Sequence, residues 1–251
     1  MYKLKFINFN NQKTNYKNTG DLYCSPSIYF NFNVEFTLED YNTYIPKKND
    51  MCILGGGGLF STWHLNHLQN YINCHKKIVW GAGINHHDSV EYNLDKNLSL
   101  FNLVGLRDNP IKHNYKFVPC VSCMHSSLDN LYNINNDIVI YEHYDMNINL
   151  NFPKMNNRGE DIEEKINFIG SANKIITNTY HGLYWASLLK KKVVVYKPFS
   201  NRFLNTEFKI NICDETNYLI QLNESSIHSD LLNRYRKINI DYYNTVIGLL
   251  L

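Results

Sequence analysis

Short apolar runs alternate along the chain with segments whose apolar residues recur at helical spacing, a pattern typical of an open α/β sheet. In the first half, the runs predicted as strands are residues 2–9, 50–56, 76–84, 101–108 and 115–120. In the second half, the predicted strands are residues 137–144, 174–179 and 192–198. We therefore expect an α/β fold.

Four segments between and after these runs are predicted as helices. In the first of them, Leu59, Trp63, His67 and Tyr71 stand at every fourth position and so share one side of the helix. The second has acidic side chains in its first turn, where the helix dipole favours them. The last is amphipathic and is expected to pack back on the core. These helices are residues 59–75, 159–172, 182–191 and 228–251.

The polar stretch 126–137 divides the pattern into two α/β units, so we expect an N-terminal domain over residues 1–133 and a C-terminal domain over residues 134–251. No linker rich in proline or glycine separates them, so the two units are expected to pack closely. In open α/β sheets, ligands bind beyond the carboxyl ends of the strands, so the residues that follow each strand are the candidates for function.

Composition and charge exclude several classes of protein. The 251 residues carry a formal net charge of +2 with scattered lysines and arginines, which gives no electrostatic reason to expect nucleic acid. No apolar run approaches the roughly 20 residues that span a bilayer, and the N-terminus lacks the features of a signal peptide. We expect a soluble cytoplasmic protein. The terminal apolar residues leave peripheral association with the inner face of a membrane as an alternative.

Six cysteines in a chain of this size do not indicate a disulfide framework. Cys120 and Cys123 form a CxxC pair with His125 close by, but no second ligand pair at zinc-site spacing follows. Packing thiols are therefore expected, and we assign no metal site and no cofactor. A metal bound by Cys120 and Cys123, with His125 as a third ligand, stays open as the alternative.

Glycine turns and polar residues follow several predicted strands. The turn at residues 53–60, "ILGGGGLF", either offers backbone N–H groups to a ligand or is simply a tight turn. It matches neither a dinucleotide fingerprint nor a Walker motif. A second glycine turn covers residues 80–88, Arg107 follows the next strand, and His143 ends a strand in the second half.

The stretch "TNTYHG", residues 177–182, stands where a strand becomes a helix. Thr177, Asn178 and Thr179 suit an N-cap and need no further explanation. His181 beside Gly182 is different, because a charged histidine in a first helical turn meets an unfavourable dipole. A neutral histidine there can contact an anion or transfer protons.

The ordered set of motifs resembles the polysaccharide pyruvyl transferase family. The motifs are "NTGD", "ILGGGGLF", "IVWGAGIN", "VGLRD", "VPCVSCM" and "TNTYHGLYWASLLKKKVVVY", over about residues 18–205. The resemblance implies two Rossmann-like domains facing across a cleft, similar to GT-B glycosyltransferases. It also implies transfer of a pyruvyl group from phosphoenolpyruvate, as donor substrate, to two hydroxyls of a sugar in a glycan or lipid-linked acceptor.

On this hypothesis the candidate residues take three roles. His181 and His143 are the catalytic candidates. The donor would be bound by Thr177, Asn178, Thr179, Gly182, Lys197, Arg202 and Arg107. The acceptor would be bound by Asn18, Gly20, Asp21, Gly56, Gly57 and Gly58.

The sequence departs from the family at one informative position. Many members have an arginine two residues before the histidine, whereas this chain has Thr179. Another cation must then neutralise the donor, and Arg202 and Lys197 in "YKPFSNRF" are the candidates for that role. Two alternatives stay open, namely a GT-B-type glycosyltransferase with a sugar-nucleotide donor and a carbohydrate-binding protein without catalysis.

Overall fold

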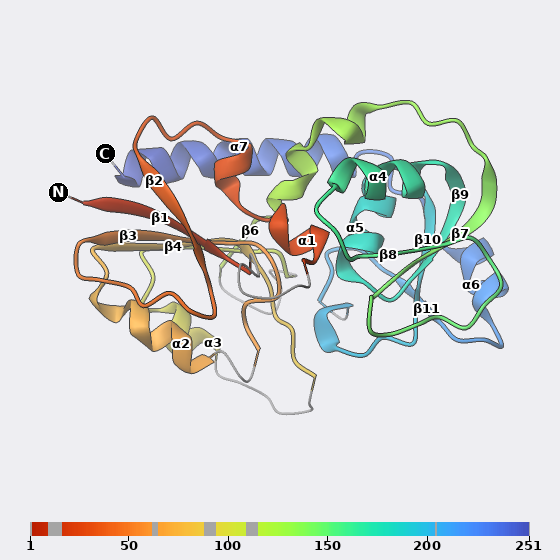
Figure 1. Ribbon diagram of the computed structural model, residues 1–251, viewed down its shortest axis with the longest axis horizontal. Helices are drawn as coiled ribbons and strands as arrows, with labels where there is room; N and C mark the ends of the chain where they lie inside the picture. The colour runs from red at the N-terminus through yellow and green to blue at the C-terminus, as the bar shows by residue number, and fades with distance from the viewer. Residues whose placement is uncertain are drawn as a thin grey trace.

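The computed structural model describes residues 2–9, 17–61, 65–87, 94–108, 115–203 and 205–250. Within these residues the strands form two sheets, one of six strands and one of five, and their strand pairings are parallel (Figure 1). The expected α/β fold is thus confirmed, and its two parallel sheets are consistent with two Rossmann-like domains.

The first sheet has the strand order β2-β1-β3-β4-β5-β6 among the described residues. Side chains that alternate along a strand point to opposite faces, and here both faces are apolar. Cys52, Leu54 and Val79 belong to the core under α2 and α3, whereas Ile53 and Ile78 belong to the core under α7. The strands are β1 (Lys3–Asn8), β2 (Phe36–Asp40), β3 (Asp50–Gly55), β4 (Lys76–Ala82), β5 (Leu103–Leu106) and β6 (Lys116–Phe117), and the helices are α2 (Leu65–Gln69), α3 (Leu94–Leu98) and α7 (Leu231–Leu250).

The second sheet has the order β11-β10-β9-β7-β8 and is covered in the same way. Val139, Ile175 and Val195 pack under α4 and α5, while Ile176 and Val194 pack on the other face with α6. The strands are β7 (Asn136–Glu142), β8 (Lys154–Asn156), β9 (Ala172–Thr177), β10 (Lys192–Tyr196) and β11 (Asn211–Cys213), and the helices are α4 (Ile162–Gly170), α5 (Tyr180–Leu188) and α6 (Tyr218–Glu224).

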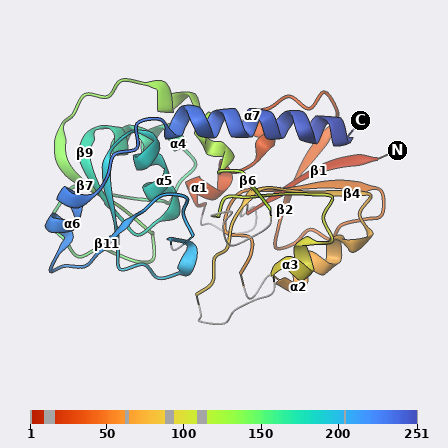
Figure 2. The ribbon, with the colours of Figure 1, turned by 180° about the vertical axis from the view of Figure 1, so that it is seen from behind.

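Helix α7 runs along the first sheet, and its N-terminal end reaches α5 in the second half of the chain (Figures 1 and 2). Its C-terminal part lies on the first sheet, where the Tyr242 hydroxyl donates to the carbonyl of Val79 at 2.6 Å. Its N-terminal part lies beside the second, where the rings of Tyr235 and Tyr184 stack 5.9 Å apart. The predicted return of the final helix to the core is confirmed. No helix within the described residues combines the length and apolar character needed to cross a bilayer.

Most predicted elements are present, with shifted ends. The eight predicted strands correspond to β1, β3, β4, β5, β6, β7, β9 and β10, and three of the predicted helices correspond to α4, α5 and α7. The helix expected over 59–75 is reduced, within the described residues, to α2 and the 3-10 turn Asn70–Asn73. Trp63 of that pattern lies outside them. Helices α1 (Thr19–Leu22), α3 and α6 and strands β2, β8 and β11 were not predicted.

The sheets divide between β6 and β7, on either side of the polar stretch 126–137. The domain boundaries themselves stay a prediction, as do the cleft and the GT-B arrangement.

Candidate functional site

A small pocket, with a cavity volume of about 20 Å³, is formed by residues from both halves of the chain. The first half contributes the segment around α1 (Thr19–Leu22), the glycine turn after β3 and the residue after β5. The second half contributes the first turn of α5, the turn after β8 and the 3-10 turn Asn201–Phe203. The lining residues are Asn18, Asp21, Gly58, Arg107, Asn157, Thr179, Tyr180, His181 and Arg202.

Helix α1 is held against the second half by backbone contacts. The N–H of Thr19 donates to the carbonyl of Asn157 at 3.0 Å, and the Thr19 hydroxyl donates to the carbonyl of Gly159 at 2.8 Å. The Asn18 side chain caps the helix by accepting from the N–H of Gly20 at 3.1 Å. These contacts bring Asp21, which was expected on the acceptor side, next to the donor candidates.

Two guanidinium groups border the pocket. Arg107 is buried, with its guanidinium 3.6 Å from the centre of the Tyr180 ring. Arg202 is partly exposed and lies 4.5 Å from the Phe199 ring centre. Burial and the neighbouring charge of Arg107 lower the pKa of Arg202 to about 10, so it is still a cation at neutral pH.

These two cations have unsatisfied donors. Within the described residues, Nε and Nη1 of Arg107 and Nε of Arg202 are buried without a hydrogen-bond partner, and neither side chain forms an ion pair. Leaving a buried donor unpaired costs about 1–3 kcal/mol, and more when the group is charged. An anion in the pocket would satisfy them.

The glycine turn after β4 makes room for Arg107. A Cβ at Gly83 would stand 2.2 Å from Nε of Arg107, so only glycine accommodates the arginine side chain there. The neighbouring Asp108 accepts a hydrogen bond from the N–H of Ile84 at 2.8 Å, which ties β5 to the same turn. Burial raises the pKa of Asp108 to about 6.

Asp21 is the acidic group of the pocket. Burial raises the pKa of its carboxyl group, although His181, Arg107 and Arg202 act in the opposite direction. A carboxyl group with a raised pKa beside two guanidiniums is suited to proton transfer.

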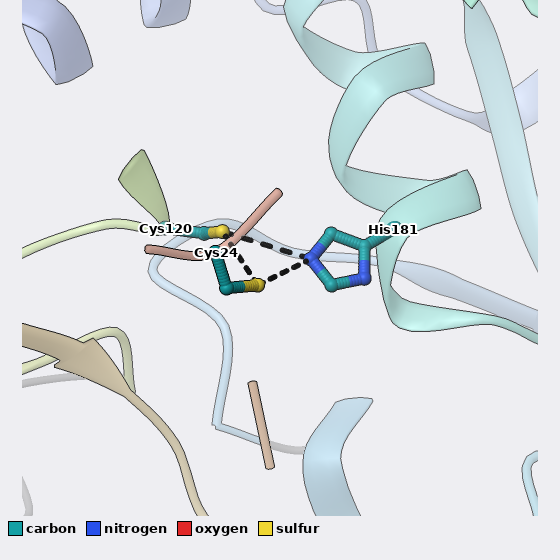
Figure 3. A group of neighbouring side chains, drawn as sticks. All are labelled: Cys24, Cys120 and His181. Atoms are coloured by element: carbon teal, nitrogen blue, oxygen red, sulfur yellow. Dashed lines mark hydrogen bonds between the residues drawn. The ribbon is translucent and has the colours of Figure 1, made fainter. Parts of the chain in front are cut away.

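His181 is buried between α1 and two cysteine thiols. Its Nε2 lies 3.4 Å from Sγ of Cys24 and 3.6 Å from Sγ of Cys120, as Figure 3 shows. A Cβ at Gly20 would stand only 2.0 Å from Nδ1 of the same ring. The glycine of the "NTGD" motif therefore provides the space in which the histidine ring lies.

The two thiols beside His181 also contact each other, with their sulfurs 3.5 Å apart. Burial opposes ionisation of Cys120, but hydrogen bonds from Cys24 and His181 lower the pKa of its thiol. Burial and the contact with Cys120 raise the pKa of Cys24. The buried contact between the two sulfurs thus disfavours ionisation of both thiols at once.

The residues before His181 form the N-cap that their types suggested. The Thr179 hydroxyl accepts from the N–H of Gly182 at 2.9 Å, and the Thr177 hydroxyl accepts from the N–H of Thr179 at 3.0 Å. Asn178 accepts from the N–H of His143 at 2.7 Å and donates to the carbonyl of Met146 at 2.6 Å. Of the three polar residues, only Thr179 also lines the pocket.

Other candidates lie outside the pocket lining. Lys197 is exposed and paired with Glu215. His143 packs against Phe199, 5.3 Å between ring centres, and burial and Arg202 lower its pKa. Gly56 and Gly57 lie close to Cys24 and Asp21 respectively. A ligand-binding role for these residues stays a prediction.

Several residues of the site were not among the candidates. Tyr180 follows the cap and places its ring under Arg107, and Asn157 lies in a turn after an unpredicted strand. Cys24 and Cys120 had been assigned to packing. The signal in the sequence was their position, because Cys24 follows the "NTGD" motif and Cys120 lies within "VPCVSCM".

The chain matches one family model in sequence and is similar in fold to a solved structure. The family model described as polysaccharide pyruvyl transferase matches residues 3–198. Among solved structures, the chain is similar to an uncharacterised protein of Klebsiella pneumoniae subsp. pneumoniae NTUH-K2044. The TM-score is 0.52 and the identity 20%, over 94% of this chain and 91% of that chain, which shows a shared fold. No protein of curated function matches the chain. Because the family model covers most of its length, including strands β1 to β10 and the pocket residues up to His181, the chain belongs to the polysaccharide pyruvyl transferase family.

Proposed function

We propose that this member of the family transfers the pyruvyl group of phosphoenolpyruvate to two hydroxyls of a sugar, forming a cyclic ketal on a glycan. The observation that carries the proposal is the pair of guanidiniums, Arg107 and Arg202, whose buried N–H groups have no partner within the described residues. Phosphoenolpyruvate has a phosphate and a carboxylate, and guanidinium groups bind both kinds of anion by paired hydrogen bonds.

Arg107 could replace the arginine that many relatives have at the position of Thr179. Relatives with an arginine at that position would place a cation beside the histidine. Here the guanidinium of Arg107 lies over the ring of Tyr180, the residue between Thr179 and His181, and comes from the end of β5 instead. The donor-binding cation would then be supplied by the first half of the chain.

The chemistry needs a group that relays protons. In ketal formation both sugar oxygens bond to C2 of the donor, the bond from C2 to the phosphate oxygen breaks, and C3 takes up a proton. The two hydroxyl protons end on C3 and on phosphate, so no net proton is consumed. Asp21 and His181 line the pocket and are the proposed groups for this relay, with His143 as the more distant candidate. The acceptor would enter beside Asn18 and Gly58.

Thermal unfolding with and without ligand tests the donor. Phosphoenolpyruvate should raise the melting temperature of the wild-type chain, because a ligand that binds only the folded state stabilises it. Arg107→Ala and Arg202→Ala should each weaken that binding by roughly tenfold or more, since each removes charge-assisted hydrogen bonds. The sequence predicts donor binding by Lys197 as well, but this cation is exposed and paired with Glu215. The proposal therefore gives it no part in donor binding, and Lys197→Ala is the matched control.

Two results would contradict the assignment. The first is stabilisation by sugar nucleotides and not by phosphoenolpyruvate, which would favour a glycosyltransferase. The second is an equal loss of affinity in Lys197→Ala and in the two pocket variants, which would place the anion elsewhere.

A further inference from the structure

We propose that Cys24, Cys120 and His181 form a binding site for a zinc ion or a similar thiophilic divalent metal. The three ligand atoms form a nearly equilateral triangle. The two sulfurs are 3.5 Å apart, and Nε2 of His181 is 3.4 Å from one and 3.6 Å from the other (Figure 3). Within the described residues this is the one group of three potential ligands gathered so closely.

The triangle has the dimensions of a zinc site. Zinc lies about 2.3 Å from thiolate sulfur and about 2.0–2.1 Å from histidine nitrogen, usually in tetrahedral geometry. Tetrahedral angles then place two sulfur ligands about 3.8 Å apart and a sulfur and a nitrogen about 3.5 Å apart. The observed separations differ from these by only a few tenths of an ångström, so the three ligand atoms already lie close to the spacing that zinc requires.

The three ligands come from segments that are remote in sequence but fixed in space. Cys24 follows α1, Cys120 precedes the 3-10 turn Val121–Met124, and His181 lies in the first turn of α5. All three side chains are buried. The carbonyl of Cys120 accepts from the Tyr184 hydroxyl at 2.7 Å, which fixes this ligand from the side of α5. Such preorganisation lowers the cost of binding an ion.

The charges of the three side chains also favour a divalent metal ion. Two thiolates and a neutral imidazole around a divalent cation have no net charge, so the site would coexist with the cations Arg107 and Arg202. Without a metal, two buried thiolates would be strongly disfavoured. Three protein ligands leave a fourth position open, which is the arrangement of catalytic rather than structural zinc.

A second pair of thiols in the chain shows what distinguishes the site. Cys52 and Cys74 have their sulfurs 3.4 Å apart, but within the described residues no third ligand joins them. Cys123, the partner of Cys120 in the CxxC motif, instead accepts from Nδ2 of Asn239 at 3.3 Å. The proposed site therefore differs from a metal site formed by Cys120, Cys123 and His125. The thiols of Cys52 and Cys123 lie outside it and provide internal controls.

The inference goes beyond the proposed function and has a consequence for it. With Nε2 bound to the metal, His181 could not relay protons through that atom, and Asp21 would be the relay group. Metal binding and donor binding are measured separately, so either proposal can fail alone.

Cobalt binding tests the site. The untagged, reduced wild-type chain would be stripped with a chelator and titrated with Co²⁺, whose absorption bands report thiolate ligands and tetrahedral geometry. We expect one Co²⁺ per chain, displaced by Zn²⁺. Cys24→Ala and Cys120→Ala each remove a direct ligand, so they should weaken binding by more than the roughly 10–100-fold that loss of an outer-shell partner costs. Cys123→Ala and Cys52→Ala should bind as the wild type does.

A measurement on the wild type keeps the test decisive if the ligand variants fail to fold. X-ray absorption of the zinc-loaded wild-type chain should show two sulfur ligands, with nitrogen or oxygen completing the shell. Absence of the thiolate bands from the cobalt-loaded wild type, a zinc shell without sulfur or with four sulfurs, or unchanged binding in folded Cys24→Ala and Cys120→Ala would each overturn the proposal.

Discussion

Single residues determine the shape of the pocket mainly through the space that they leave. Gly20 leaves room for the ring of His181, and Gly83 leaves room for Arg107, since a Cβ at either glycine would stand 2.0 Å and 2.2 Å, respectively, from the nearest side-chain nitrogen. Gly20 belongs to the "NTGD" motif and Gly83 to "IVWGAGIN", and the residues of these motifs alone do not show which side chain each glycine accommodates. Their positions show that the motifs act as pairs, with a glycine on one segment and a functional side chain on another.

Gly20→Ala should therefore displace His181. Because the ring is buried between α1 and the two thiols, the added methyl group has no free space, and we expect a loss of about 1–3 kcal/mol in the free energy of unfolding. Binding of Co²⁺ should weaken as well, since Nε2 would move away from the sulfurs. Urea unfolding and the cobalt titration measure the two effects.

The control for this substitution is Gly248→Ala in α7. A Cβ at Gly248 meets nothing within 4 Å, and alanine is the better helix former by about 1 kcal/mol. This variant should be as stable as the wild type or more stable. If Gly20→Ala were equally harmless, the packing of His181 against Gly20 would not determine the position of the ring.

At the scale of elements, the strands that the sequence did not predict lie at the edges of the two sheets. Strands β2, β8 and β11 each lie at the edge of a sheet, where only one neighbour supplies hydrogen bonds. Their side chains are largely exposed or half-buried, so they lack the continuous apolar run of the central strands. The central strands β3, β4, β7, β9 and β10 are apolar on both faces and were recognisable for that reason.

Helix α5 begins at a cap that also borders the pocket. Thr179→Ala removes the hydroxyl that accepts from the N–H of Gly182 and should lower the free energy of unfolding by about 1 kcal/mol. Thr179→Ser keeps that oxygen and should lose much less. Chemical unfolding of the three proteins measures the difference, and equal losses in the two variants would show that the methyl group, rather than the cap, accounts for the effect.

At the scale of the whole molecule, α7 and α1 tie the two sheets together. Asn239 of α7 is fully buried and accepts from Nε1 of Trp80 at 2.8 Å in the first sheet. The same side chain donates to the carbonyl of Pro119 and to Sγ of Cys123, in the segment that leads to the second sheet. Helix α1 makes the complementary connection, because it follows β1 of the first sheet but bonds to residues after β8 of the second.

Asn239→Ala should destabilise the entire chain. The substitution leaves the buried indole N–H of Trp80 without a partner, and we expect a loss on the order of 2–4 kcal/mol. Fluorescence and circular dichroism should still report one shared unfolding transition, at a lower denaturant concentration.

Lys237→Ala provides the comparison on the same helix. Lys237 pairs with Asp241, but both side chains are exposed, and a surface pair of this kind contributes about 0–1 kcal/mol. A loss in Asn239→Ala no larger than in Lys237→Ala would show that the buried side chain does not stabilise the contact between α7 and the sheets.

The sequence by itself determined the α/β alternation, the central strands, the capped start of α5 and the family. All of these depend on local periodicity or on short motifs, which are readable because neighbouring residues impose them. Only the tertiary structure decided which motifs meet. Cys24, Cys120 and His181 are separated by 61 to 157 positions, and Arg107 reaches Tyr180 from the other sheet. Contacts between such distant residues depend on how helices and sheets pack as whole surfaces, and no periodicity within the chain encodes that packing.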